Sequence, residues 1–181
     1  GGLGTRLRSE VADRSKVVAE VGERPFITRI FDQLIGVGIR RAVLCTGYKA
    51  EGVEGLLGDR YGNLELVYSP EIEPLGTAGA LRNALELLDT SPLLVLNGDS
   101  YFSGNLLELL DFHHKNDAFG SIMLCYMEDV ASYGQVRVDD SGVIGGFEEK
   151  SGKAEPGWVN AGLYLLRKEW IESISIDRKV S

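Results

Sequence analysis

The 181-residue chain has only two cysteines, and it contains no long run of apolar residues. The two thiols, Cys45 and Cys125, occur singly in apolar, strand-like runs without a C-x-x-C spacing. We therefore expect both to be buried thiols in a reducing compartment, which predicts a cytoplasmic location. No apolar stretch approaches the roughly 20 residues that a membrane-spanning helix needs, so we expect no membrane partner.

Positive charge is also scarce, because 27 acidic residues outnumber 19 Lys and Arg and leave a net charge of −8. This balance argues against nucleic acid or an anionic membrane surface as a partner. The cations are unevenly spread, however, since 10 of the 19 lie within the first 60 residues. Their distribution suits an anion-binding site in the N-terminal third of a single globular domain.

Several familiar catalytic patterns are missing from the chain. No Ser or Cys nucleophile stands out beside a plausible His partner. His113 and His114 have no third metal ligand with them, so we expect them to be structural. The fingerprint G-x-G-x-x-G would need a glycine in place of Leu7, and the pattern G-x-x-x-x-G-K is absent. An Asp-x-Asp metal clamp is absent at Asp99, because Tyr101 lies two residues later.

The chain opens instead with a glycine-rich loop, Gly1-Gly2-Leu3-Gly4-Thr5-Arg6-Leu7. Glycines let the backbone turn tightly, so successive N–H groups can form a concave site for phosphate. Arg6 adds a planar donor pair that matches phosphate oxygens, and Lys16 adds a mobile positive charge. The alternative is an ordinary surface turn with solvated cations. Because such a loop normally follows a strand, we expect a first strand before Gly1 and a further segment after Ser181.

Apolar periodicity predicts alternating strands and helices over the first two-thirds of the chain. The expected helices cover 25–35, 50–57, 78–88 and 106–114, and the expected strands cover 41–46, 64–68, 92–96 and 121–126. A hairpin of 135–138 with 143–147 and an extended run over 158–166 make the last third more antiparallel. The pattern predicts an α/β domain, with a predominantly parallel sheet flanked by helices and a mixed, antiparallel edge.

Asp99 follows the most apolar of the expected strands, through Asn97 and Gly98. In open α/β sheets, ligands bind at the carboxyl ends of the strands, where a carboxylate is well placed to hold a metal ion. Mg²⁺ prefers one or two carboxylates and completes its coordination with phosphate and water. The alternative for Asp99 is an N-cap of the following helix, although we expect that helix to start only near Asn105.

Two further groups of polar residues lie in the antiparallel third of the chain. Glu148, Glu149 and Lys150 end a strand, so that Glu149 points to the opposite face from its two neighbours. The alternative is a solvated strand end. Asn160 and Gly162 interrupt an apolar strand, which indicates either close approach of the backbone to a polar group or a β-bulge.

Together, these elements resemble the sugar-1-phosphate nucleotidyltransferase family. The opening loop with Lys16 resembles that family's G-G-x-G-T-R-L…P-K signature, Pro74-Leu75-Gly76-Thr77-Ala78-Gly79 resembles its base-contacting loop, and Asn97-Gly98-Asp99 is similar to its metal site. The segments similar to its sugar-phosphate side are Tyr133-Gly134, Phe147-Glu148-Glu149-Lys150 and Val159-Asn160-Ala161-Gly162-Leu163-Tyr164. The likeness is greatest to the guanylyltransferase branch, and within it to the D-glycero-α-D-manno-heptose 1-phosphate guanylyltransferases of bacterial surface-polysaccharide (lipopolysaccharide and capsule) synthesis.

The resemblance implies a Rossmann-like, GT-A-type fold in one domain over residues 1–181, with a nucleotide-binding half (about 1–105) and a sugar-phosphate-binding half (about 106–181). It implies Mg²⁺-dependent, in-line attack of a sugar 1-phosphate on the α-phosphorus of a nucleoside triphosphate, with release of pyrophosphate. The implied substrates are GTP and D-glycero-α-D-manno-heptose 1-phosphate.

The resemblance also implies roles for individual residues. The implied catalytic residues are Arg6, Lys16 and Asp99, with Asp99 as the metal ligand. The implied nucleotide-binding residues are Gly1, Gly2, Leu3, Gly4, Thr5, Arg6, Leu75, Gly76 and Thr77. The implied sugar-phosphate-binding residues are Gly134, Glu149, Lys150, Asn160 and Gly162.

Two departures from the family pattern keep alternatives open. Ser15 stands where the family usually has a proline before the signature lysine, and nothing in Lys168–Ser181 matches the family's second metal-binding Asp. One alternative is therefore a non-catalytic homologue that senses nucleotide or sugar. Another is the same chemistry on mannose 1-phosphate or glucose 1-phosphate. A homo-oligomer is compatible with either alternative.

Overall fold

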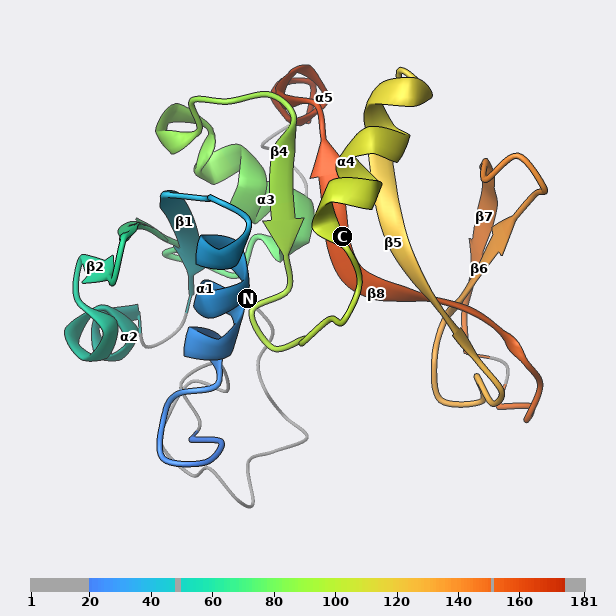
Figure 1. Ribbon diagram of the computed structural model, residues 1–181, viewed down its shortest axis with the longest axis horizontal. Coiled ribbons are helices and arrows are strands. Elements are labelled where there is room, and N and C mark those ends of the chain that lie inside the picture. The colour runs from blue at the N-terminus through green and yellow to red at the C-terminus, as the bar shows by residue number, and fades with distance from the viewer. Residues whose placement is uncertain (1–19, 48–49, 151, 175–181) are drawn as a thin grey trace. The chain divides into compact units, whose positions relative to one another are not determined.

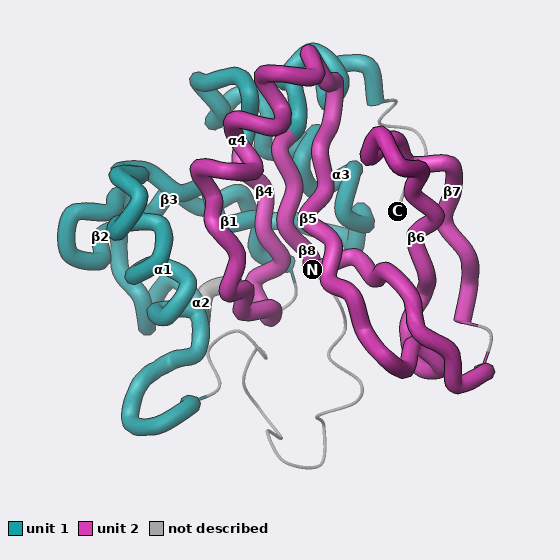
Figure 2. The backbone as a smooth tube through the Cα atoms, turned by 45° about the vertical axis from the view of Figure 1, so that its right-hand side comes forward, with its two compact units in different colours: residues 1–93, 166–181 teal, residues 94–165 magenta. Residues whose placement is uncertain are grey.

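The computed structural model describes residues 20–47, 50–150 and 152–174 (Figure 1). The chain forms two compact units, which Figure 2 shows in different colours. Unit 1 combines Gly1–Leu93 with Leu166–Ser181, and unit 2 is Leu94–Leu165. Among the helices of the described residues, none is long and apolar enough to cross a membrane. The expected division near residue 105 separates a nucleotide-binding half from a sugar-phosphate-binding half, and it stays a prediction.

In unit 1, the helix α1 (Ile27–Gly36) presents one apolar face to the core. The buried residues of this face recur at the three- and four-residue spacing of a helix, and they are Ile27, Ile30, Phe31 and Leu34. The helix ends where Gly38 adopts a φ of +90°, a conformation that favours glycine. The expected helix and its glycine-rich end are therefore confirmed, but the expected start at Pro25 is wrong, because Pro25 forms an isolated bridge with Glu20 and the helix begins at Ile27.

The sheet of unit 1 has the strand order β1-β3-β2. β1 (Arg41–Thr46) pairs in parallel with β3 (Leu64–Pro70), and β2 (Arg60–Tyr61) pairs antiparallel with the start of β3. The connection from β1 contains α2 (Ala50–Leu57). The remaining elements of unit 1 are α3 (Gly76–Asn83), the 3₁₀ turn η3 (Leu85–Leu87) and α5 (Lys168–Glu172), whose Ile171 is fully buried.

In unit 2, the long strand β8 (Gly157–Leu166) organises a five-stranded sheet. The strand order is β4-β8-β6-β7, and β5 also pairs with β8. The partner strands are β4 (Leu93–Leu96), which begins at the edge of unit 1, β5 (Gly120–Met127), β6 (Gln135–Val138) and β7 (Ile144–Glu148). β6 is antiparallel to both β7 and β8. The expected antiparallel edge is thus present, and parallel pairing is observed between β1 and β3.

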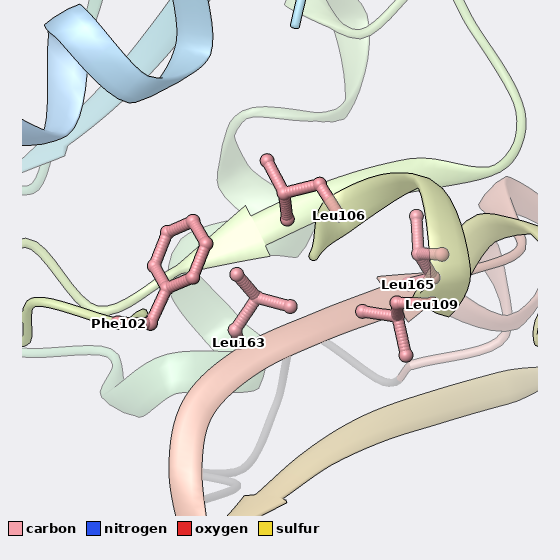
Figure 3. Close-up of a cluster of buried hydrophobic side chains, with 5 residues drawn as sticks. All are labelled: Phe102, Leu106, Leu109, Leu163 and Leu165. Atoms are coloured by element: carbon pink, nitrogen blue, oxygen red, sulfur yellow. The ribbon is translucent and has the colours of Figure 1, made fainter. Parts of the chain in front are cut away.

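The core of unit 2 forms where β8 meets α4 (Leu106–Lys115). Figure 3 shows the five buried side chains of this cluster: Phe102, Leu106, Leu109, Leu163 and Leu165. Leu94 and Leu96 of β4 pack against the same cluster. The face of β4 that carries Leu94 and Leu96 is therefore covered by apolar side chains.

The expectation that both thiols are buried is wrong for Cys125. Cys125 is exposed, and Cys45 is partly buried. Cys125 lies in the second half of β5, where the strand becomes exposed at Cys125 and Tyr126 after a buried start at Ser121. An apolar run does not distinguish a strand covered along its whole length from one covered only at its start.

The core of unit 2 yields a stability prediction. Leu163 is 1% exposed, so Leu163→Ala leaves a cavity and is expected to lower the free energy of unfolding by about 3 kcal/mol. Leu107, in the first turn of α4, is 58% exposed, and Leu107→Ala is expected to cost less than about 0.5 kcal/mol. Urea unfolding of the two variants measures both values, and equal losses would contradict the assigned core.

Candidate functional site

The segment that follows β4 turns sharply at Asn97 and leaves Asp99 exposed. The backbone N–H of Asn97 donates to the carbonyl of Gly162 on β8 (2.8 Å), and the N–H of Ser100 donates to the carbonyl of Asn97 (3.3 Å). The helix α4 is capped by Asn105, whose side chain accepts from the N–H of Leu107 (3.0 Å). The alternative in which Asp99 caps this helix is therefore wrong, and its carboxylate lies at the carboxyl end of a strand, as expected.

Gly162 allows the Asn97 side chain to lie against β8. Gly162 has a φ of +77°, and a Cβ at this position would lie 2.6 Å from Nδ2 of Asn97. The Asn160 side chain supports the local backbone, because its Oδ1 accepts from the N–H of Gly162 (2.8 Å) and its Nδ2 donates to the Tyr164 hydroxyl (2.8 Å). The close backbone approach predicted for Asn160 and Gly162 is thus observed at Gly162, and the polar group involved is Asn97.

An open pocket of about 330 Å³ lies at the antiparallel edge of unit 2. Its lining residues come from three segments of unit 2: Tyr133, Gly134, Gln135, Val136, Phe147, Glu148, Glu149, Val159 and Asn160. Three of the five residues predicted to bind a sugar phosphate are among them, namely Gly134, Glu149 and Asn160. Lys150 is exposed directly after Glu149, and Gly162 lies two residues beyond Asn160. Sequence reasoning therefore located most of this pocket, but it missed Gln135.

The acidic wall of the pocket is partly neutralised by Arg137 on β6. Nε of Arg137 lies 2.9 Å from Oε1 of Glu148, and both side chains are substantially exposed. The guanidinium lies over Gly146, where a Cβ would approach it to 3.2 Å. Gly134 is also restricted, because a Cβ there would lie 3.1 Å from the carbonyl oxygen of Glu148. Small residues in this hairpin thus let a cation and a second backbone approach closely.

In unit 1, the segment predicted as a base-contacting loop begins the helix α3. Gly76 and Thr77 lie in its first turn, so the predicted helix start at residue 78 is wrong. Gly76 has a φ of +75°, which bends the chain sharply after Leu75 and favours glycine. The helical pattern predicted up to residue 88 is also too long, because a 3₁₀ turn replaces the α-helix after Asn83.

Glu71 positions this helix start, and sequence reasoning missed it. Its carboxylate is buried and accepts a hydrogen bond from the N–H of Leu75 (3.0 Å). A carboxylate is favourable at this place because it satisfies a free N–H at the start of a helix. Burial, followed by the charge of Glu71, raises the pKa of the Cys45 thiol to about 11. The sequence feature that could have identified Glu71 is its place as an acidic residue directly after the strand that ends at Pro70.

The residues predicted to bind the phosphates of the nucleotide, which are the opening loop Gly1–Arg6 and Lys16, lie outside the described residues. Within the described part of the chain, no group of three or more His, Cys, Asp or Glu side chains is arranged to hold a metal ion.

His113 is buried, and its Nδ1 lies 2.9 Å from the Ser121 hydroxyl, which confirms a structural place for this histidine.

Comparisons with known proteins agree with the motifs. The family model described as "Nucleotidyl transferase" matches residues 1–180. The D-glycero-alpha-D-manno-heptose 1-phosphate guanylyltransferase of Aneurinibacillus thermoaerophilus is 38% identical over 181 residues, which cover all of this chain and 78% of that protein. The mannose-1-phosphate guanylyltransferase of Mycobacterium tuberculosis is 32% identical over all of this chain and 51% of that protein.

A solved structure supports the same likeness. The crystal structure of HddC from Yersinia pseudotuberculosis complexed with GMP-PN matches with a TM-score of 0.83 and 32% identity. The match covers 96% of this chain and 76% of that chain. The expected α/β fold is thereby confirmed.

The Asn97 contact leads to a prediction for Gly162→Ala. This variant places a Cβ at a positive φ and against the Asn97 amide, so we expect a loss of about 3 kcal/mol in the free energy of unfolding. The control is Gly145→Ala on β7, whose Cβ would meet only the carbonyl of Arg137 at 4.0 Å. Equal denaturant midpoints for the two variants would contradict the constraint at Gly162.

Proposed function

Because the chain belongs to the nucleotidyl transferase family, we propose that it joins a sugar 1-phosphate to a nucleoside monophosphate unit taken from a nucleoside triphosphate. The products are a nucleoside diphosphate sugar and pyrophosphate. The observation that carries this proposal is the pocket of unit 2, which gathers Gly134, Glu149 and Asn160 from separate segments of the sequence.

The preferred substrates in this proposal are GTP and D-glycero-α-D-manno-heptose 1-phosphate. Two relatives named for this heptose activity are 36% and 38% identical and are matched over 79% and 78% of their length, whereas relatives named for mannose 1-phosphate are 32% and 36% identical and are matched over 51% and 50% of theirs. The structure matched with 32% identity is complexed with GMP-PN, which favours a guanine nucleotide. Mannose 1-phosphate and glucose 1-phosphate remain the alternative acceptors.

The proposed chemistry needs no protein nucleophile. An oxygen of the sugar phosphate attacks the α-phosphorus, a new P–O bond forms, and pyrophosphate leaves with the electron pair of the broken P–O bond. Because two anions must meet, the contribution of the chain is positioning and charge neutralisation. Arg6 and the N–H groups of Gly1–Arg6 hold the β- and γ-phosphates, and Lys16 offsets the charge that develops at the reacting phosphate.

The pocket residues hold the acceptor in this proposal. Lys150 neutralises the sugar phosphate, and Glu149 and Asn160 form hydrogen bonds with sugar hydroxyls. Gly134 leaves space for the sugar beside the backbone, with Gly162 supporting the site through Asn97. In unit 1, Leu75, Gly76 and Thr77 contact the base, and Glu71 holds this segment in place.

Asp99 is the proposed ligand of Mg²⁺. Its carboxylate is exposed at the end of β4, and a single carboxylate suits this ion, which takes its other ligands from phosphate and water. When bound, Mg²⁺ would supply positive charge to the phosphate oxygens. Asp99 fixes where that charge lies, because its turn is tied to β8 through Asn97.

The test is a pyrophosphate-release assay on the natural full-length protein with Mg²⁺. The four common ribonucleoside triphosphates and thymidine triphosphate are each paired with heptose, mannose and glucose 1-phosphates. We expect the highest kcat/KM for GTP with the heptose substrate. Turnover of another pair would correct the substrates alone. Absence of pyrophosphate with every pair, despite measurable nucleotide binding, would overturn the reaction in favour of a nucleotide-sensing homologue.

The role of Arg6 gives a further prediction. Arg6→Ala removes the paired donors to the phosphates, so kcat should fall about 100-fold while the unfolding midpoint stays unchanged. The control is Arg40→Ala, because the Arg40 guanidinium is exposed and its hydrogen bonds within the described part of the chain go to the nearby carbonyls of Ile35 and Ile39. An Arg6→Ala variant with normal turnover would rule out this role.

A further inference from the structure

Three aromatic side chains of the antiparallel sheet in unit 2 are exposed, and the proposed reaction has no role for them so far. Phe147 on β7 is 63% exposed, Tyr126 on β5 is 50% exposed and Trp158 on β8 is 41% exposed. A single exposed aromatic residue needs no explanation. Aromatic residues that gather on one face, however, indicate a surface that a ligand or a partner covers.

Trp158 and Phe147 lie on the face of the sheet that carries the proposed sugar-binding residues. Side chains two residues apart on a strand point to the same face, so Trp158 shares a face with Asn160. Exposure along β8 follows this alternation, because Trp158 and Asn160 are exposed whereas Val159 between them is buried. By the same alternation, Phe147 shares its face with Glu149, the residue directly after β7.

Two rows of side chains therefore cross this face of the sheet. Both rows follow from the antiparallel register in which Gln135 lies opposite Glu148 and Val159. One residue before Gln135 lies a polar row with a glycine at its centre: Asn160, Gly134 and Glu149. One residue after Gln135 lies an apolar row with a buried valine at its centre: Trp158, Val136 and Phe147. Since a strand advances about 3.4 Å per residue, the two rows lie about 7 Å apart.

The apolar row is held in place and continues the pocket. The ring of Trp158 packs edge-on against Tyr126, with the ring centroids 5.1 Å apart. Because β5 pairs with β8, this aromatic pair joins two neighbouring strands (Figure 1). Phe147 and Val136 both line the pocket of unit 2. A pocket lined by a few polar groups and bordered by aromatic rings is the usual form of a small-molecule site.

The charge beyond the polar row orients a sugar phosphate on this face. Lys150 follows Glu149 in the chain, so it lies on the opposite side of Glu149 from Phe147. In the proposed function, Lys150 neutralises the phosphate, which is attached to C1 of the sugar. The exocyclic carbons, attached at C5, are then directed toward the apolar row. A hexose has one such carbon, and a heptose has two.

We propose that Phe147 and Trp158 form an apolar contact for the exocyclic carbons of the acceptor, and that this contact selects a heptose 1-phosphate over a hexose 1-phosphate. This inference rests on the proposed function and deepens it. D-glycero-α-D-manno-heptose has the ring of mannose and one further carbon beyond C6. An additional carbon held against apolar side chains is worth roughly tenfold in kcat/KM. The competing interpretation is that another protein chain covers the apolar row.

The first experiment measures pyrophosphate release by the natural full-length protein with GTP and either heptose or mannose 1-phosphate. The variants are Phe147→Ala and Trp158→Ala, and the control is Phe119→Ala, which changes another exposed phenylalanine (66%) directly before β5. We expect both variants to lower the ratio of kcat/KM for heptose over mannose 1-phosphate about tenfold, with KM for GTP within about twofold of the wild type. The control should keep the wild-type ratio.

The second experiment observes the contact directly through Trp158. The chain has two tryptophans, so Trp170→Phe leaves Trp158 as the only one in residues 1–181. Heptose 1-phosphate is added to this variant in the presence of Mg²⁺ and α,β-methylene GTP, which cannot be turned over. We expect a saturable change in tryptophan emission, and a smaller change with mannose 1-phosphate at saturation. Unchanged emission at concentrations that saturate turnover would contradict the contact.

The outcomes separate this inference from the proposed function. An active wild type that uses mannose 1-phosphate as well as heptose 1-phosphate would overturn the inference alone. Phe147→Ala and Trp158→Ala variants that keep the wild-type ratio would also overturn it, and a change in their oligomeric state by light scattering would then assign the apolar row to a protein interface. Equal losses for both sugar phosphates would leave only a structural role. A wild type that releases no pyrophosphate with any substrate pair would overturn the proposed function and the inference together.

Discussion

The contact between Asn97 and Gly162 is the constraint on which unit 2 depends. Because Gly162 has no side chain and adopts a positive φ, the Asn97 amide lies against β8 while the Asn97 N–H bonds to the Gly162 carbonyl at 2.8 Å. This contact fixes the turn that ends β4 and therefore the position of Asp99. The same bend in β8 is stabilised by Asn160, which lines the pocket. One glycine thus connects the proposed metal ligand with the proposed sugar site.

Around the pocket, glycines on neighbouring strands likewise make room for polar side chains. Gly146 admits the Arg137 guanidinium, which pairs with Glu148, and Gly157 admits the Gln135 amide. A Cβ at Gly157 would lie 2.6 Å from the Gln135 amide oxygen and collide with it, whereas a Cβ at Gly146 would lie 3.2 Å from the Arg137 guanidinium, which is a tight contact. These strands therefore hold polar side chains by close packing, and larger residues at these glycines would displace them.

The spacing of apolar residues predicted most of the helices and strands, because each of them buries apolar side chains that are close together in sequence. β1, α2 and β6 have the predicted bounds, and Gly38 ends α1 as expected. The start of α3 was wrong because it is set by Gly76 and by the distant carboxylate of Glu71, neither of which follows from spacing. The exposure of Cys125 was missed because an apolar strand does not reveal what covers it.

The motifs located the pocket in part, since Gly134, Glu149 and Asn160 occur in recognisable patterns. Gln135 was missed because its contacts are with Glu155 and Gly157, which lie about twenty residues away in sequence. The central claim is a single in-line transfer at the α-phosphorus without a protein nucleophile. Its most direct test is the stereochemistry of the product formed from one diastereomer of GTPαS and the sugar 1-phosphate. The account predicts inversion at the α-phosphorus, and retention would contradict it.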